Sequence, residues 1–170
     1  GDAAFRVRIL SSSAGAIHTV AGNNAQRTHF RFYNNNGNVG AIRTNNNNTS
    51  FNTSSDYRLK ENAVRISDGI TRLKTLKPYK FNFKNEPSLT VDGFFAHEAT
   101  QIPGAVGGTK DEVVTQAMVD AGDYPESDLN NPIYQDIDHS KFVPLLTAAL
   151  QDAVAKIETL EAKVAALEAK

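Results

Sequence analysis

Ser55 and Lys60 stand five residues apart in the segment Ser55-Asp56-Tyr57-Arg58-Leu59-Lys60. A serine hydroxyl is a weak nucleophile at neutral pH unless a neighbouring base takes its proton, and a lysine is such a base only when neutral. An ordinary lysine, with a pKa of about 10.4, is protonated, whereas burial lowers the pKa of a lysine. A buried Ser–Lys pair could thus act as nucleophile and base, but the spacing alone is a weak signal for this chemistry. Alternatively, Ser55 caps a turn and Lys60 is solvated.

Other combinations of reactive residues do not complete a known motif. His97-Glu98 begins like the helix motif of a zinc protease, but position 101 is Gln where the motif needs a second His. Gly107-Gly108-Thr109-Lys110 lacks the residue order of a phosphate-binding loop. The four His residues are scattered and there is no Cys, so we expect no metal site and no cofactor.

The Ser–Lys segment lies at a break in composition. Residues 1–53 hold eleven of the sixteen Asn, five Arg, no Lys and one acid, which gives a charge of +4, whereas residues 54–170 sum to −5. Such a change indicates two structural units that meet near residue 53.

The sequence of the first unit predicts short strands. Alternating side chains at 5–9 and 30–33 predict strands with one solvated face, and 39–42 is a third candidate. Asn36-Gly37 between the last two predicts a hairpin turn. These strands hold too few large apolar residues for a monomeric core, so we expect intertwined chains of a fibre. Asn45–Asn48 is a flexible amide loop or a stacked polar ladder.

The second unit reads as mixed α+β. Ile70, Leu73 and Leu76 have helical spacing and are followed by Pro78. Residues 79–83 alternate like a strand, and residues 89–96 form another strand candidate.

The C-terminal 28 residues carry the clearest pattern, a heptad repeat. Val143, Leu150, Ile157 and Val164 occupy position a, and Leu146, Ala153, Leu160 and Leu167 occupy position d. Lys156 and Lys163 fall at g, where they can meet Glu161 and Glu168 at e of a parallel neighbour. The repeat predicts a self-associating coiled coil. The alternative is an amphipathic helix that packs on its own domain.

Overall composition excludes several classes of protein. The net charge of −1 provides no basic field for nucleic acid, and no window of eighteen apolar residues is available to cross a membrane. With 170 residues, a large independent catalytic fold is not expected. We expect this sequence to be the C-terminal part of a longer chain.

Four stretches in fixed order, SSDYRLKEN, DGITRLKTLKPYKFNF, GFFAHEA and IPGAV, precede the heptad helix. Together they resemble the intramolecular chaperone autoprocessing domain that closes phage tail spikes, tail fibres and endosialidases. A related domain occurs in membrane-bound myelin regulatory factors. The resemblance covers about residues 54–170, and the S-D-x-R-L-K stretch is its most specific part. Family members commonly have Gln at the position of His97.

The resemblance implies a homotrimer whose chaperone domain helps three fibre chains to intertwine and then cuts itself off. The family pattern maps the nucleophile to Ser55 and the base to Lys60, with scission between Ser54 and Ser55. The side chain of Ser54 has no role in this chemistry, so its change to Ala is expected to be tolerated.

The expected organisation is a β-rich trimeric fibre segment (1–54), a mixed α+β chaperone domain (55–142) and a coiled-coil helix (143–170). The trimer would close through heptad residues, among them Leu146, Leu150, Ile157, Leu160, Val164 and Leu167. We expect a tail fibre or spike that is assembled in the host cytoplasm and contacts a host-surface receptor or glycan through its fibre part. The competing hypothesis is a permanent trimeric structural or receptor-binding tip that is never cut.

Overall fold

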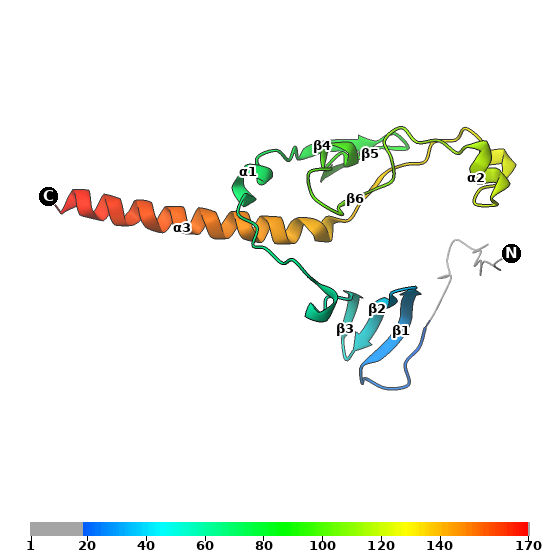
Figure 1. The fold of residues 1–170 in the computed structure, drawn as a ribbon, viewed down its shortest axis with the longest axis horizontal. Coiled ribbons are helices and arrows are strands. Elements are labelled where there is room, and N and C mark those ends of the chain that lie inside the picture. Colours follow the sequence, from blue (N-terminus) through cyan, green and yellow to red (C-terminus); the bar gives the residue numbers. More distant parts are fainter. Residues whose placement is uncertain (1–18, 170) are drawn as a thin grey trace. The chain divides into compact units, whose positions relative to one another are not determined.

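The computed structural model describes residues 19–169, so the strand predicted at 5–9 lies outside the described residues. The chain forms two compact units, Gly1–Ala63 and Val64–Lys170. The described part contains both strands and helices, which confirms the predicted α+β class (Figure 1).

The first unit is built on a three-stranded antiparallel sheet. Strands β1 (Arg27–Asn34), β2 (Gly37–Asn45) and β3 (Asn48–Thr53) pair in the order β1-β2-β3. The hairpin predicted at Asn36-Gly37 is confirmed, and Gly37 has the positive φ, +90°, that such a turn requires. The amide-rich segment after β2 is a tight turn, because Asn45 and Asn48 already pair with each other in the sheet.

This sheet buries little in the single chain. Phe30, Ile42 and Phe51 lie opposite one another across the three strands, and Phe51 is 78% exposed. Among the described residues of the sheet, only Ala41 is buried. The described part of the sheet therefore has no core of its own, and the packing of these strands against further chains stays a prediction.

The second unit contains the long helix α3 and two small two-stranded antiparallel sheets. After the 3-10 turn η1 (Tyr57–Leu59) come α1 (Gly69–Leu73), β4 (Tyr79–Phe83), β5 (Glu86–Gly93), η2 (Ala96–Glu98), β6 (Val106–Gly107), α2 (Gln116–Asp120), η3 (Glu126–Asp128), β7 (Asp136–Ile137), η4 (His139–Lys141) and α3 (Phe142–Glu168). Strand β4 pairs with β5, and β6 with β7. The strand predicted at 79–83 is confirmed, and a helix forms before Pro78, but it ends at Leu73, so the predicted member Leu76 lies outside it. The strand predicted at 89–96 is displaced, because β5 ends at Gly93, and helix α3 starts one residue before the predicted position.

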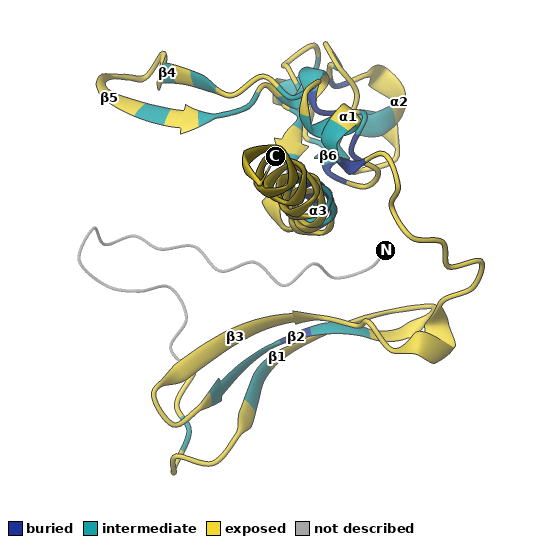
Figure 2. Cartoon of the chain, turned by 90° about the vertical axis from the view of Figure 1, so that its left-hand side faces the viewer, coloured by how far each residue is buried: buried dark blue, intermediate teal, exposed yellow. Residues whose placement is uncertain are grey.

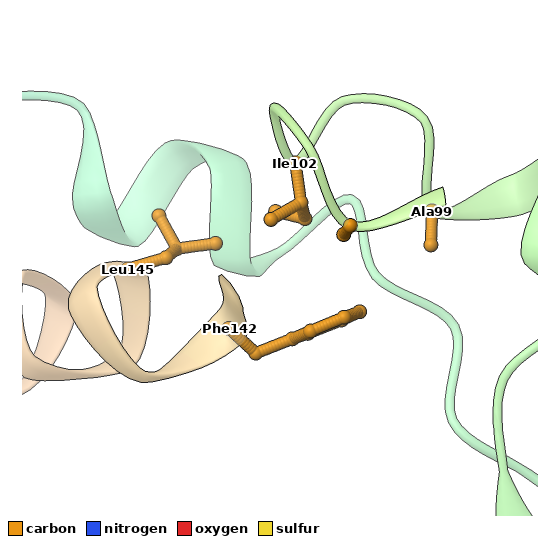
Figure 3. Close-up of a cluster of buried hydrophobic side chains, with 5 residues drawn as sticks. Ala99, Ile102, Phe142 and Leu145 are labelled. Carbon is orange, nitrogen blue, oxygen red and sulfur yellow. The ribbon is translucent and has the colours of Figure 1, made fainter. Parts of the chain in front are cut away.

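The core of the second unit joins the start of α3 to the loop that follows η2. Figure 3 shows Phe142 and Leu145 of α3 facing Ile102 and Ala99. Helix α1 approaches α3 closely at Gly69, where a Cβ atom would lie 2.7 Å from the backbone nitrogen of Ala149. Only glycine allows this crossing without displacement of one helix.

Helix α3 has two different apolar faces. Phe142, Leu145 and Ala149 are buried against the helix's own unit. Most of helix α3 is exposed, as Figure 2 shows. The exposed residues include seven of the eight heptad residues, which lie on another face of the helix: Val143, Leu146, Leu150, Ile157, Leu160, Val164 and Leu167. The side chains that pack on the helix's own unit therefore lie on a different stripe of α3 from the heptad residues, most of which remain exposed.

Within residues 19–169, no helix combines the length and apolar character needed to span a bilayer.

Candidate active site

The Ser–Lys pair is formed by one short turn directly after the sheet. Strand β3 ends at Thr53, and η1 occupies residues 57–59. Across this turn, Lys60 Nζ donates a hydrogen bond of 2.6 Å to Ser55 Oγ. The structure therefore brings together the two residues that the sequence nominates as base and nucleophile.

Asp56 holds this turn closed. Its side chain caps η1 by accepting a hydrogen bond of 2.9 Å from the backbone N–H of Arg58. The guanidinium of Arg58 donates to both carboxylate oxygens, at 2.9 and 2.8 Å. Hydrogen bonds from the Arg58 side chain, and secondly from its backbone, hold the pKa of Asp56 below its ordinary value. The same ion pair raises the pKa of Arg58.

Ser54, on the other side of the proposed scissile bond, is fixed to β2. Its backbone N–H donates to the carbonyl oxygen of Val39 at 3.0 Å, and its hydroxyl donates to the carbonyl oxygen of Asn38 at 2.8 Å. Sequence reasoning missed this contact, because it assigned no role to the Ser54 side chain. The peptide bond between Ser54 and Ser55 thus lies between a residue anchored to the sheet and a residue anchored to the turn.

The pair is solvated in the single chain. Ser55 and Lys60 are both exposed, and the apolar side chains of Tyr57 and Leu59 beside them are 82% and 69% exposed. The amine of Lys60 is thus open to water, which would compete with the serine hydroxyl for it. The single chain therefore provides the geometry of a Ser–Lys pair without the dry surroundings that would activate it.

His97 and Glu98 belong to the second unit and form no metal site. Glu98 Oε1 accepts a hydrogen bond of 2.8 Å from Lys77 Nζ, which is the main reason that the pKa of Glu98 is lowered. The His97 ring stacks on Phe95 at a centroid distance of 6.0 Å. Over residues 19–169, no three carboxylate or imidazole side chains gather as metal ligands would.

A comparison with protein families assigns the segment that starts at the proposed nucleophile. Residues 55–107 match the family model described as chaperone of endosialidase. No curated protein matches the chain. The first matched residue is Ser55 itself, the residue directly after the proposed cut. The match at residues 55–107 supports the C-terminal chaperone domain of phage tail proteins that the sequence resembles.

Proposed function

We propose that this chain ends a homotrimeric phage tail fibre or spike, that its C-terminal part chaperones the folding of the fibre, and that it then releases itself by scission between Ser54 and Ser55. The observation that carries the proposal is the 2.6 Å hydrogen bond between Lys60 Nζ and Ser55 Oγ at the first residues of the family match. The site lies one residue beyond the last strand of the sheet, where a cut would separate fibre from chaperone.

In the proposed reaction, neutral Lys60 takes the proton of the Ser55 hydroxyl, and Oγ attacks the carbonyl carbon of Ser54. The C–N bond between the two residues breaks, the proton passes to the nitrogen of Ser55, and Ser54 is left as an ester on Oγ. Water then hydrolyses the ester to a carboxylate on Ser54 and a free hydroxyl on Ser55. Each chain performs this reaction once, on its own backbone.

Trimer formation would supply the dry surroundings that the single chain lacks. Burial of Tyr57 and Leu59 against neighbouring chains would remove water from the Ser–Lys pair. Desolvation favours the neutral form of an amine, which is the form that acts as a base. Scission would therefore follow assembly.

The exposed heptad stripe supports self-association through α3. Seven of its eight a and d side chains are exposed, all except Ala153, and the helix is long enough for nearly four heptads. β-branched residues at a with Leu at d are also compatible with a dimer. The trimer is inferred from the family and from the need to close three fibre chains.

Assembly through α3 would solve a folding problem of the fibre. Intertwined β chains form mainly nonlocal and intermolecular pairs, so they reach the right register slowly and are prone to aggregate. A coiled coil would gather the three C-termini first. Removal of the chaperone afterwards leaves a product that lacks its folding template, which makes the assembled fibre kinetically stable.

The remaining parts of the proposal concern partners and location. The family supports an association with the virion tail, and the fibre part would contact a host-surface receptor or glycan. The competing function is a permanent trimeric tip in which Asp56 caps the turn, Lys60 stays solvated and no bond is cut.

Site-directed variants test the proposed scission. We expect the unchanged 170-residue chain to yield fragments of 54 and 116 residues, with Ser55 as the new N-terminus. Ser55→Ala and Lys60→Ala should each give one intact band while the protein still associates, because each removes a chemical role from an exposed side chain. Ser88→Ala and Lys84→Ala are matched exposed controls in the second unit and should be cut normally.

Denaturing electrophoresis, N-terminal sequencing and light scattering provide the readouts. An intact wild-type chain would favour the permanent tip. A small fragment from Ser55→Ala, or a different new N-terminus, would contradict the assignment of Ser55.

A further inference from the structure

The proposed active-site turn belongs to the same compact unit as the sheet of β1, β2 and β3, which is called the fibre sheet below. The chain divides after Ala63, so the Ser55–Lys60 turn lies in the first unit, although the family match begins at residue 55. Ser54, whose carbonyl group forms the acyl side of the scissile bond, is held by hydrogen bonds to the backbone of strand β2. The fibre sheet is therefore close enough to the bond to influence its cleavage.

The pairing of β2 with β3 continues to the edge of the scissile bond. Gly40 lies opposite Thr53, the last residue of β3. The next residue, Ser54, extends the pairing through its N–H bond to Val39, and its hydroxyl adds the bond to Asn38. Beyond Ser54 the chain leaves the sheet and enters the turn.

The two strands are in close contact at this end. A Cβ atom on Gly40 would lie 2.8 Å from the backbone oxygen of Asn52 in β3. Real Cβ atoms essentially never approach a backbone oxygen so closely, so a side chain here must push β3 away from β2. Gly40 thereby allows the pairing that holds Ser54.

We propose that the pairing of β3 with β2 is a requirement for the cut, and that Ser54 is a positioning residue whose hydroxyl holds the scissile carbonyl in place. This inference rests on the proposed function. It adds that scission depends on the folded state of the fibre sheet as well as on assembly through α3, so the chaperone is released only from a fibre whose last strand has found its place.

The chemistry explains why the position of Ser54 matters. The attacking Oγ and the attacked carbonyl belong to consecutive residues, so the attack closes a five-membered ring whose geometry is set by rotations next to the peptide bond. The turn fixes Oγ through Lys60, and the sheet fixes the carbonyl through Ser54. Loss of either anchor lets the peptide sample unreactive rotations, and a misplacement of about 1 Å can lower a rate by about 100-fold.

Gly40→Ala tests the role of strand pairing. We expect it to slow scission by about 100-fold while assembly through α3 persists, because the added Cβ displaces β3 next to Ser54. Gly22→Ala is the matched control: it lies in the same unit, and a Cβ there meets nothing within 4 Å. The full chain is synthesised in a cell-free system with a pulse of labelled amino acid, and scission is followed on denaturing gels.

A second pair of variants tests the hydroxyl without disturbing the fold. Ser54 is exposed, so Ser54→Ala removes its bond to Asn38 and should slow scission roughly two- to tenfold, the usual worth of one such hydrogen bond. Ser54→Thr keeps the hydroxyl on an extended residue and should retain most of the rate. A purely structural role would not predict this rescue at equal thermal stability.

Hydrogen exchange of the β3 amides shows whether Gly40→Ala has displaced the strand, and light scattering shows whether the chains still associate. Scission at the wild-type rate in Gly40→Ala with fast-exchanging β3 amides would overturn the inference, as would wild-type rates in Ser54→Ala. If the wild-type chain is not cut between residues 54 and 55, the proposed function itself fails.

Discussion

At the scale of residues, the lysine is the donor in the hydrogen bond between Lys60 and Ser55. The lysine donates to the hydroxyl at 2.6 Å, whereas a base must accept from it. The same two atoms can make either bond, so loss of one proton from the amine reverses the direction without moving the chain. In the proposed reaction, the pair would therefore need a change of surroundings and little change of geometry.

The carboxyl of Asp56 provides a test of which group controls the pH dependence. Its pKa is lowered in the folded turn, first by the Arg58 side chain, so its stabilising effect is present above the unfolded value of about 3.9. That effect is lost as the pH falls through the lowered folded pKa. Above about pH 5 the turn is insensitive to this carboxyl, and any change of scission rate reports the base.

We predict that Asp56→Asn slows scission several-fold at every pH between about 6 and 9 and leaves the midpoint of the pH profile unchanged. Asparagine can still cap the turn but loses the ion pair with Arg58. Rates are measured on chains refolded from urea into a series of buffers. A shifted midpoint would identify Asp56 as a titrating member of the site and remove Lys60 from the role of sole base.

At the scale of elements, helix α3 has one buried apolar face and one exposed apolar face. Phe142, Leu145 and Ala149 are buried against the helix's own unit, whereas most heptad residues are exposed. In the proposed trimer, the exposed heptad residues would pack against other copies while the buried residues stay in their own domain.

A charge in the heptad stripe should abolish both association and scission. In Leu160→Asp each helix would lose the burial of a leucine, about 1.5–3 kcal/mol, and would place a carboxylate in the seam. Ala162→Asp is the matched control, because it adds the same charge at the outward f position of the same heptad.

Light scattering gives the mass of each variant, and gels give the fraction cut. We expect monomeric, uncut Leu160→Asp and associated, cut Ala162→Asp. Efficient scission in a monomeric Leu160→Asp would break the proposed link between the helix and the chemistry.

Local patterns predicted the elements and not their contacts. Asn36-Gly37 and the alternation at residues 79–83 predict the observed hairpin and strand because turn chemistry and strand periodicity are local properties. The anchoring of Ser54 to Asn38 depends on a partner sixteen residues away, which no local pattern encodes. The buried stripe of α3 did leave a signal, since residues 142, 145 and 149 have helical spacing, but the stronger heptad pattern obscured it.

At the scale of the whole molecule, the two compact units carry different features. In the first unit, Ala41 is the only buried residue among the described residues 19–63, and this part carries the Ser–Lys pair. The second unit has its own small core and a long helix with exposed heptad residues. In the proposed trimer, other copies would complete the first unit, and the helix of the second unit would gather them.

The most direct test of the account is to follow assembly and scission together in one refolding sample. Native mass spectrometry over a range of chain concentrations resolves intact monomers, intact trimers and trimers that have lost a fragment. The account predicts that intact trimers form first, that the cut after Ser54 lags behind them, and that dilution delays both. Intact monomers that are cut at a rate independent of concentration would contradict the account.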